Sequence, residues 1–329
     1  MIEISVIICT YNRSDYLPAA IKSCIRQTMD DKKYEILIID NNSTDGTEKI
    51  VRCFQKEYRN IRYFKEESQG LNFARNRGAA EAEGRYVAYL DDDARAEPDW
   101  LTNMIKTFRR QNPQPVCAGG CVRLDWEGPV PDWFPQEFNA LMAFVDHGSS
   151  GFYLKYGEEG HFLIGTNMAF QRDVLIDMNG FRTAYGRKKR RTISGAETEL
   201  VNRLLLQGLP VYYSPDAAVT HTVVPERRTR RFLIKRMFGD GATQPLMDLE
   251  TERFCSTPLI RRILYDMKIC IGYYFQYLYR KIIINDPQSL THYLFFTQRR
   301  GRLSMELRFL YDPEFRPLWK NRRQGLRVE

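Results

Sequence analysis

Residues 86–93 read Tyr-Val-Ala-Tyr-Leu-Asp-Asp-Asp, a short apolar run that ends in three consecutive carboxylates. An apolar run of this length predicts a buried strand. Three adjacent carboxylates repel one another, so a fold that keeps them charged needs a cation close by. One or two carboxylates together with substrate phosphates are the usual ligands of Mg²⁺ or Mn²⁺. Taken alone, the triplet could also be an acidic turn, so its surroundings have to decide.

The sequence around this strand alternates between strand and helix patterns. Ser14 or Asp15 could cap the first helix. Further strands are predicted over residues 4–10, 35–40 and 61–64, and helices over 16–27, 47–58, 71–82 and 99–109. Buried strands that alternate with helices imply an α/β fold with a mostly parallel sheet flanked by helices.

Three of these strands run into polar residues at their carboxyl ends: 10–13, 40–42 and 91–93. In an open α/β sheet, ligands bind outside the carboxyl ends of the strands. The polar groups should therefore converge on one edge and form a site there. Asp40 could accept a hydrogen bond from a base imide, while the residues after it also fit a plain turn and helix cap.

Four motifs follow one another in the first hundred residues. They are Ser5–Arg13 (SVIICTYNR), Ile38–Thr47 (IIDNNSTDGT), Gly70–Asn76 (GLNFARN) and Tyr89–Asp93 (YLDDD). In this order and spacing they resemble family 2 glycosyltransferases, which have the Rossmann-like GT-A fold. The resemblance covers residues 1–225 well and the remainder weakly. It implies an inverting enzyme that takes a sugar from a nucleotide-sugar donor with the help of Mn²⁺ or Mg²⁺.

The resemblance also implies roles for the matching residues. Asp40 would read the base, and Asp91 would approach the ribose. Asp93 would hold the metal ion, with Asp92 as a substitute, and a late histidine of the family points to His221 near the metal or pyrophosphate. A lone histidine on a strand is otherwise most often structural. The nucleotide and donor would be bound by Thr10, Tyr11, Asn12, Arg13, Asp40, Asn42, Gly70, Ala74, Arg75, Asn76, Asp91 and Asp92.

The general base is expected near residue 197. The family often carries Gly-Glu-Asp-x-Glu-Leu, whereas residues 195–200 of this chain read Gly-Ala-Glu-Thr-Glu-Leu. The alignment places Glu197 at the aspartate that removes the acceptor proton, provided that its longer side chain comes within about 2.6–3.2 Å of the acceptor hydroxyl. Glu199 would position an arginine or acceptor groups. The alternative is that both are solvated carboxylates favoured by the helix dipole.

The chain is expected to divide near residue 225. Residues 1–225 would form the catalytic domain, with a nucleotide-binding half over 1–112 and an acceptor half over 113–225. The acceptor half should hold strands at 116–124, 164–170, 211–214 and 218–222, a helix at 193–207, and a mobile loop at 148–160. Residues 226–329 would form a helical, basic region.

Charge and hydrophobicity set the last third apart. Residues 225–329 hold 21 Lys and Arg against 11 Asp and Glu, so they carry the whole excess of positive charge. Apolar residues between 260 and 282 recur at helical spacing beside basic ones, which fits either packing on the catalytic domain or contact with an anionic membrane surface. The basic cluster 187–191 fits a lid over donor phosphates or a solvated loop, and the cluster 227–231 could meet lipid phosphates. Because no apolar run reaches 18 residues, we expect no spanning helix.

The sequence therefore predicts a metal-dependent glycosyltransferase with a donor such as a UDP-sugar and a saccharide or lipid-linked acceptor. Bacterial surface polysaccharide synthesis is the pathway that the resemblance suggests. Seven cysteines without a CxxC pair, and no secretory leader, favour the cytoplasm or the cytoplasmic face of the inner membrane.

Two alternatives remain open. A nucleotidyltransferase would need a Gly-rich basic loop after the first strand, where Thr10–Arg13 stands instead. A nucleic-acid-binding protein would leave the strand-end motifs unexplained, and the aromatic residues do not interleave with the basic clusters, so no nucleic acid is expected as a partner. The oligomeric state is not predictable from these patterns.

Overall fold

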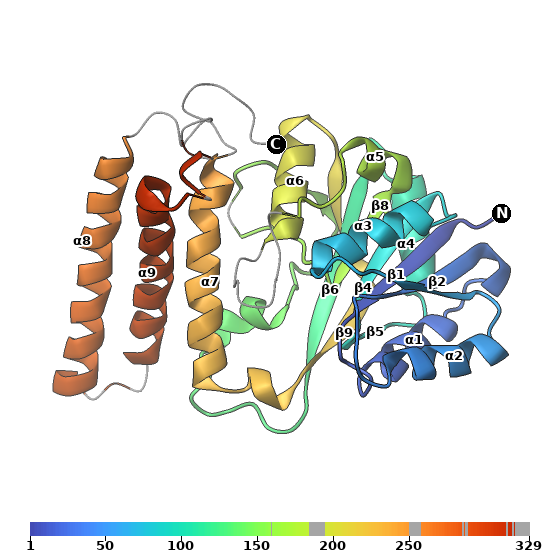
Figure 1. Cartoon of the computed structure of the whole chain (residues 1–329), viewed down its shortest axis with the longest axis horizontal. Coiled ribbons are helices and arrows are strands. Elements are labelled where there is room, and N and C mark those ends of the chain that lie inside the picture. The colour runs from blue at the N-terminus through green and yellow to red at the C-terminus, as the bar shows by residue number, and fades with distance from the viewer. Residues whose placement is uncertain are drawn as a thin grey trace. The chain divides into compact units, whose positions relative to one another are not determined.

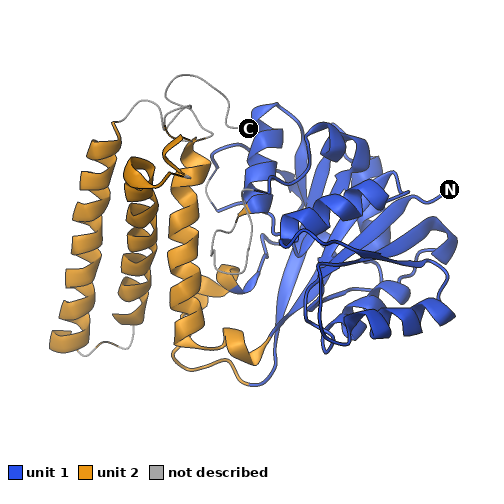
Figure 2. Ribbon diagram, in the orientation of Figure 1, with its two compact units in different colours: residues 1–128, 142–189, 196–223 blue, residues 129–141, 190–195, 224–329 orange. Residues whose placement is uncertain are grey.

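The computed structural model describes residues 1–158, 160–183, 195–249, 258–284, 286, 289–313, 315–317 and 319. The chain forms two compact units (Figure 2). Unit 1 comprises Met1–Gly128, Met142–Lys189 and Ala196–Val223, and unit 2 comprises Pro129–Leu141, Arg190–Gly195 and Val224–Glu329. The domain limits expected from the sequence, 1–225 and 226–329, stay a prediction, because compactness alone does not define an independently folding domain.

Unit 1 is built on one sheet with the strand order β3-β2-β1-β4-β8-β6-β9-β5, and β7 pairs with β9. The pairs β3–β2, β2–β1 and β1–β4 are parallel, whereas β8 runs antiparallel to both β4 and β6. The strands are β1 (Ile4–Thr10), β2 (Tyr34–Asp40), β3 (Ile61–Lys65), β4 (Tyr86–Asp91), β5 (Ala94–Ala96), β6 (Cys117–Trp126), β7 (Phe152–Tyr153), β8 (Asn167–Gln171) and β9 (Val211–Val223). The expected α/β class with a helix-flanked sheet is confirmed (Figure 1).

Helices flank this sheet. They are α1 (Leu17–Ile25), α2 (Thr47–Glu57), α3 (Leu71–Glu81), α4 (Trp100–Arg110), α5 (Arg172–Asp177) and α6 (Ala196–Leu206). The expected cap of α1 is wrong, because α1 follows Tyr16 without any side-chain cap. The amide of Ser14 instead donates to Asp45 Oδ2 at 3.0 Å, and Pro18 lies in the first helical turn, where a missing N–H costs nothing.

Three strands differ from the expectation. The two strands predicted at 211–214 and 218–222 are one strand, β9, whose pairing with β6 shifts register between Gly120 and Val122. β5 begins directly after the acidic triplet, where no strand was predicted. β7 lies inside the segment 148–160 that was expected to be only a loop.

Unit 2 is helical. Its helices are α7 (Arg230–Leu249), α8 (Leu259–Leu278), the π-helical turn η5 (Tyr279–Ile284) and α9 (Ser289–Tyr311). Within the unit, α9 lies between α7 and α8 (Figure 1). None of the helices in the described part of the chain has the length and apolarity that a bilayer crossing requires.

Glycines let α7 and α9 approach closely. A Cβ atom added at Gly241 would overlap the carbonyl of Gln298, and one added at Gly301 would overlap the carbonyl of Phe238. Both helices would have to move apart to accept a larger residue. The interface therefore depends on these two positions.

Short helical turns complete the chain. They are η1 (Asp31–Lys33), η2 (Gln136–Met142) and η3 (Pro225–Arg227). The basic cluster 227–231 spans the end of η3 and the start of α7, where Arg230 lies over the ring of Trp133 at 5.4 Å. The cluster 187–191 lies outside the described residues.

Candidate active site

The strand register gathers the predicted residues at one edge of the sheet. Thr10 at the end of β1 pairs with Asp40 at the end of β2. On the other side of β1, Cys9 pairs with Asp91 at the end of β4. Because these strands are parallel and end together, their polar termini lie side by side, as an α/β ligand site requires.

A group that could hold a metal ion lies at this edge. Asp91, Asp93 and His221 each offer one ligand atom, and these atoms lie within 4.8 Å of one another. His221 Nε2 is 3.2 Å from Asp93 Oδ1, and both side chains are almost fully buried. Two carboxylates and an imidazole suit Mn²⁺ and related divalent ions. The residues therefore fit a divalent metal ion.

Strand β5 brings His221 to the acidic triplet. Ala94 of β5 pairs with His221 of β9, and the amide of Thr222 donates to the carbonyl of Asp93 at 2.8 Å. Residues more than 120 positions apart in the sequence thus become neighbours. The strand is only three residues long, which is too short to give a pattern in the sequence.

Arg13 neutralises part of this acidic group. Its Nη1 donates to Asp93 Oδ2 at 2.9 Å, so each oxygen of Asp93 has a neighbour, Arg13 on one side and His221 on the other. Asp92 differs from the other two acids. Burial, and next the charge of Asp93, raise the pKa of Asp92 to about 7. Asp92 is not in the group that could hold a metal ion.

A second set of side chains surrounds Arg75. Its Nη2 lies 3.7 Å from Glu197 Oε1 and 4.0 Å from Asp91 Oδ1. Its guanidinium lies over the ring of Phe181 at 5.0 Å, a favourable cation–π position. Asp91 also accepts a hydrogen bond from the Thr166 hydroxyl at 2.7 Å. Arg75 therefore joins the end of β4 to the first turn of α6.

Gly165 makes room for this arrangement. A Cβ atom at this position would overlap Arg75 Nη2 and lie 2.7 Å from Glu197 Oε1. Of the two glutamates in the first turn of α6, Glu197 is partly exposed and Glu199 is buried. Glu199 pairs with Arg203 at 2.9 Å and with Arg182 at 3.4 Å. Of these two glutamates, Glu197 is thus the one that combines solvent access with a place beside the acidic edge.

Asp40 is tied into the turn that follows β2. Its Oδ1 accepts the amide of Ser43 and its Oδ2 accepts the hydroxyl of Tyr63, both at 2.8 Å. A base could use only the remaining lone pairs of this carboxylate. The partner Tyr63 could not be foreseen from the sequence, because β3 places it beside β2.

Asn12 links the turns that follow β1 and β2. Its side-chain Oδ1 accepts the backbone amide of Thr44 at 2.7 Å, and its backbone amide donates to Ser43 Oγ at 3.0 Å. Asn12 and Asn42 have φ angles of 51° and 69°, a left-handed conformation that asparagine tolerates better than most residues. Tyr11 and Asn42 are exposed beside these turns, where they could contact a ligand.

The residues predicted on α3 mostly serve its packing. Asn76 exchanges two hydrogen bonds of 2.8 Å with the backbone of Phe181, and Ala74 is fully buried. Gly70 has a φ of 144° and donates its amide to Asn41 Oδ1 at 2.7 Å. Of the predicted α3 residues, Arg75 is the one whose side chain reaches the acidic edge.

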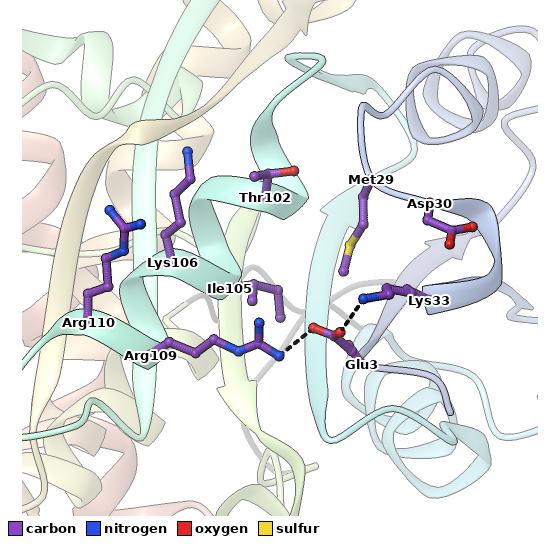
Figure 3. A pocket seen from close by; sticks show the side chains of 9 residues that line it. All are labelled: Glu3, Met29, Asp30, Lys33, Thr102, Ile105, Lys106, Arg109 and Arg110. Carbon is purple, nitrogen blue, oxygen red and sulfur yellow. Dashed lines mark hydrogen bonds and ion pairs between the residues drawn. The ribbon is translucent and has the colours of Figure 1, made fainter.

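Two cavities of unit 1 lie away from this site. The larger, of about 490 Å³, is lined by residues such as Glu3, which precedes β1, and is therefore at the amino end of the strands. Figure 3 shows Glu3 in ion pairs with Lys33 at 3.2 Å and Arg109 at 2.8 Å. The smaller, of about 230 Å³, lies between α4 and β9. None of the predicted site residues lines either cavity.

This fold, with acidic residues at the carboxyl edge of the sheet, is that of the GT-A glycosyltransferases. Residues 5–178 match the family model described as glycosyl transferase family 2. The chain belongs to this family and is a glycosyltransferase.

Two relatives align with about three quarters of the chain. A glucosyl-dolichyl phosphate glucuronosyltransferase of Haloferax volcanii is 31% identical over 250 residues, which are 75% of this chain and 78% of the relative. A dolichyl N-acetyl-alpha-D-glucosaminyl phosphate 3-beta-D-2,3-diacetamido-2,3-dideoxy-beta-D-glucuronosyltransferase of Methanococcus voltae is 26% identical over 259 residues, 74% of this chain and 73% of that protein.

The fold is similar to that of a mannosyltransferase from Pyrobaculum calidifontis, solved in complex with GDP-mannose and Mn²⁺. The two agree with a TM-score of 0.60 at 17% identity, over 94% of this chain and 88% of that one. At this identity the likeness shows the shared fold alone.

Proposed function

We propose that this enzyme transfers a sugar, with inversion, from a nucleoside diphosphate donor to a hydroxyl of a polyprenyl-phosphate-linked saccharide, with the help of a divalent metal ion. The observation that carries the proposal is the group Asp91, Asp93 and His221 beside the Arg75–Glu197 pair in a family 2 chain. Both relatives that align with about three quarters of the chain are named as enzymes that act on dolichyl-phosphate-linked sugars, which supports this acceptor class.

The residues of the site divide the work of a single displacement. Asp91, Asp93 and His221 would hold the ion, which supplies Lewis-acid stabilisation of the departing diphosphate. Arg75 adds a fixed positive charge; its Nη1 is buried and has no hydrogen-bond partner among the described residues, so it can take an anionic group of the donor.

Glu197 would take the proton from the acceptor hydroxyl as that oxygen forms its bond to the anomeric carbon. The bond from this carbon to the diphosphate oxygen breaks on the opposite side, and the nucleoside diphosphate leaves with the electron pair. One displacement of this kind inverts the anomeric centre. Arg75 holds the carboxylate of Glu197 in position, and the absence of a side chain at Gly165 leaves room for both groups.

The donor sugar is proposed to be a uronic acid, because both long relatives are named as glucuronosyltransferases. Uridine is the base that the family resemblance favours. A lipid-linked acceptor would bring the enzyme to a membrane surface, and the free cysteines of the described residues (Cys9, Cys24, Cys53, Cys117, Cys121 and Cys270) fit the reducing, cytoplasmic side.

A donor and acceptor screen tests the proposal. Thermal shifts are measured with UDP- and GDP-linked glucuronic acid, glucose and mannose, with and without Mn²⁺, and transfer is then measured to a short polyprenyl-phosphate-linked saccharide and to the same saccharide without lipid. We expect a Mn²⁺-dependent shift with a uronic-acid donor and faster transfer to the lipid-linked acceptor. Equal transfer to both acceptors would contradict the acceptor class, and the absence of any shift would contradict the donor class.

A further inference from the structure

One face of α8 is apolar and exposed. Ile260, Leu264, Met267, Ile271, Phe275 and Ile282 have between 43% and 68% of their surface exposed. The first five lie on α8 at intervals of three or four residues and therefore form a single stripe, and Ile282 lies in the turn η5 that follows α8. Another side of the helix, with Leu259, Ile263, Asp266 and Cys270, is buried, and α9 lies beside α8 (Figure 1). A stripe of this size normally marks an interaction surface.

The charges along the stripe are all positive. Between residues 258 and 284 the only acidic residue is Asp266, which is buried and paired with Arg299 at 3.0 Å and Arg302 at 2.8 Å. Arg261 and Lys268 are exposed beside the stripe. Across the residues that the structure describes, neither has an ion-pair partner. The surface thus combines apolar side chains with uncompensated positive charge.

Aromatic residues gather at the end of this surface. Tyr274, Phe275 and Tyr279 are exposed there, and Tyr274 packs on Phe296 of α9 at 5.1 Å between ring centroids. Tyrosine is favoured at the boundary between lipid and water, because its ring is apolar and its hydroxyl is polar. This composition fits the level of the lipid headgroups.

We infer that this face of α8 and η5 docks on an anionic lipid bilayer, with the stripe at the headgroup level and Arg261 and Lys268 toward lipid phosphates. A second copy of the chain fits less well, because a two-fold contact would place the face against itself and bring like charges together. α8 would lie in the plane of the interface, as an amphipathic helix does. The inference goes beyond the proposed transfer reaction and concerns a surface outside the candidate active site.

The test measures binding of the full chain to vesicles without donor, acceptor or metal. Phosphatidylcholine vesicles with and without phosphatidylglycerol are compared by co-sedimentation. Because the vesicles hold no substrate, the result does not depend on whether the proposed transfer is correct. We expect binding to the anionic vesicles that weakens with added salt.

Two double variants separate the apolar and the charged contributions. Replacing Arg261 and Lys268 by Gln should weaken binding to anionic vesicles about 25-fold, since each basic residue near such a surface contributes about fivefold. Replacing Ile271 and Phe275 by Ser should weaken binding at least about tenfold through lost apolar burial. The matched control replaces Ile176 and Leu206, exposed residues of α5 and α6, by Ser and should bind as the wild type does.

Three results would overturn the inference. The folded wild type could fail to bind anionic vesicles, or both α8 variants, shown to be folded by circular dichroism, could bind them as strongly as the wild type. The third is a wild-type dimer in the absence of vesicles that the Ile271/Phe275 variant converts to a monomer, because the face would then serve self-association.

Discussion

Arg75 is the side chain that connects the two parts of the candidate site. It is buried and faces both Asp91, at the end of β4, and Glu197, in the first turn of α6. The sequence motifs pointed to each of these residues separately. The contact of Arg75 with Glu197 could not be predicted, because the two residues are more than 100 positions apart and their approach depends on the absence of a side chain at Gly165. The burial of Asp92 could not be predicted either, because the sequence shows only three equivalent acids in a row.

Replacement of Glu197 by Gln tests the general base. The amide keeps the size of the side chain but cannot accept the acceptor proton, so kcat should fall about 100- to 10,000-fold, while the thermal shift produced by the donor persists. Steady-state transfer kinetics and donor binding are measured on the same preparation. The control Glu57→Gln, at an exposed position on α2, should transfer at the wild-type rate. Transfer by the Glu197 variant at that same rate would remove Glu197 from the mechanism.

Regular elements were predictable wherever their pattern is long. The bounds of β1 and β4 agree with the predicted strands, because continuous apolar runs end there at polar residues. β5 and β7 have three and two residues, too few to show a period. β9 looked like two strands because Pro215 and Asp216 interrupt its apolar pattern, although β6 pairs with it on both sides of the interruption. Short elements form here because of tertiary pairing rather than local preference.

The close contact of α7 and α9 gives a prediction about stability. Gly301→Ala should lower the free energy of unfolding by about 1–3 kcal/mol, since the added methyl overlaps the backbone of Phe238. Gly272→Ala is the matched control, because a Cβ atom at that position on α8 meets nothing within 4 Å. It should raise stability by up to about 1 kcal/mol through higher helix propensity. Urea unfolding followed by circular dichroism measures both, and equal effects of the two changes would contradict the described packing.

A buried charge cluster within the helices of unit 2 gives a prediction about pH. Glu306 is fully buried, with its Oε1 3.4 Å from Arg262 and 3.6 Å from Arg302. The same arginines pair with Asp248 of α7, and Arg302 also pairs with Asp266 of α8. Burial, and next the charge of Asp266, raise the pKa of Glu306 from 4.5 to about 7. Because the folded chain holds this proton more tightly than the unfolded chain, the stability that it contributes is complete below pH 4.5 and is lost as the pH rises through 7.

Glu306→Gln removes this titration, since the amide resembles the protonated carboxyl. The stability of the variant minus that of the wild type should therefore rise by about 1–3 kcal/mol from pH 5 to pH 8. Melting temperatures of both proteins at the two pH values give the difference, in which the titration of all other groups cancels. A difference that stays the same at both pH values would show that Glu306 does not bind a proton in this range.

At the scale of the whole molecule, the candidate site lies entirely in unit 1, and the exposed apolar face lies in unit 2. The sequence predicted both kinds of region, one from ordered motifs and the other from charge and helical spacing. The family resemblance pointed to His221, but the residue pattern alone could not place it beside Asp93, because that contact depends on the return of β9 to the acidic triplet. The metal group is thus a product of tertiary structure, although two of its members stand in one motif.

The most direct test is a calorimetric titration of Mn²⁺ into the protein in the presence of UDP or GDP. Asp93→Ala removes a member of the proposed metal group. The control is Asp125→Asn, because Asp125 is a half-exposed residue of β6 that pairs with Arg95 of β5. We predict that the wild type and the control bind Mn²⁺ with similar affinity, and that Asp93→Ala weakens binding by at least about 100-fold, as expected when a direct ligand is lost. Folded Asp93→Ala protein that binds Mn²⁺ as tightly as the wild type would contradict the assignment of this site.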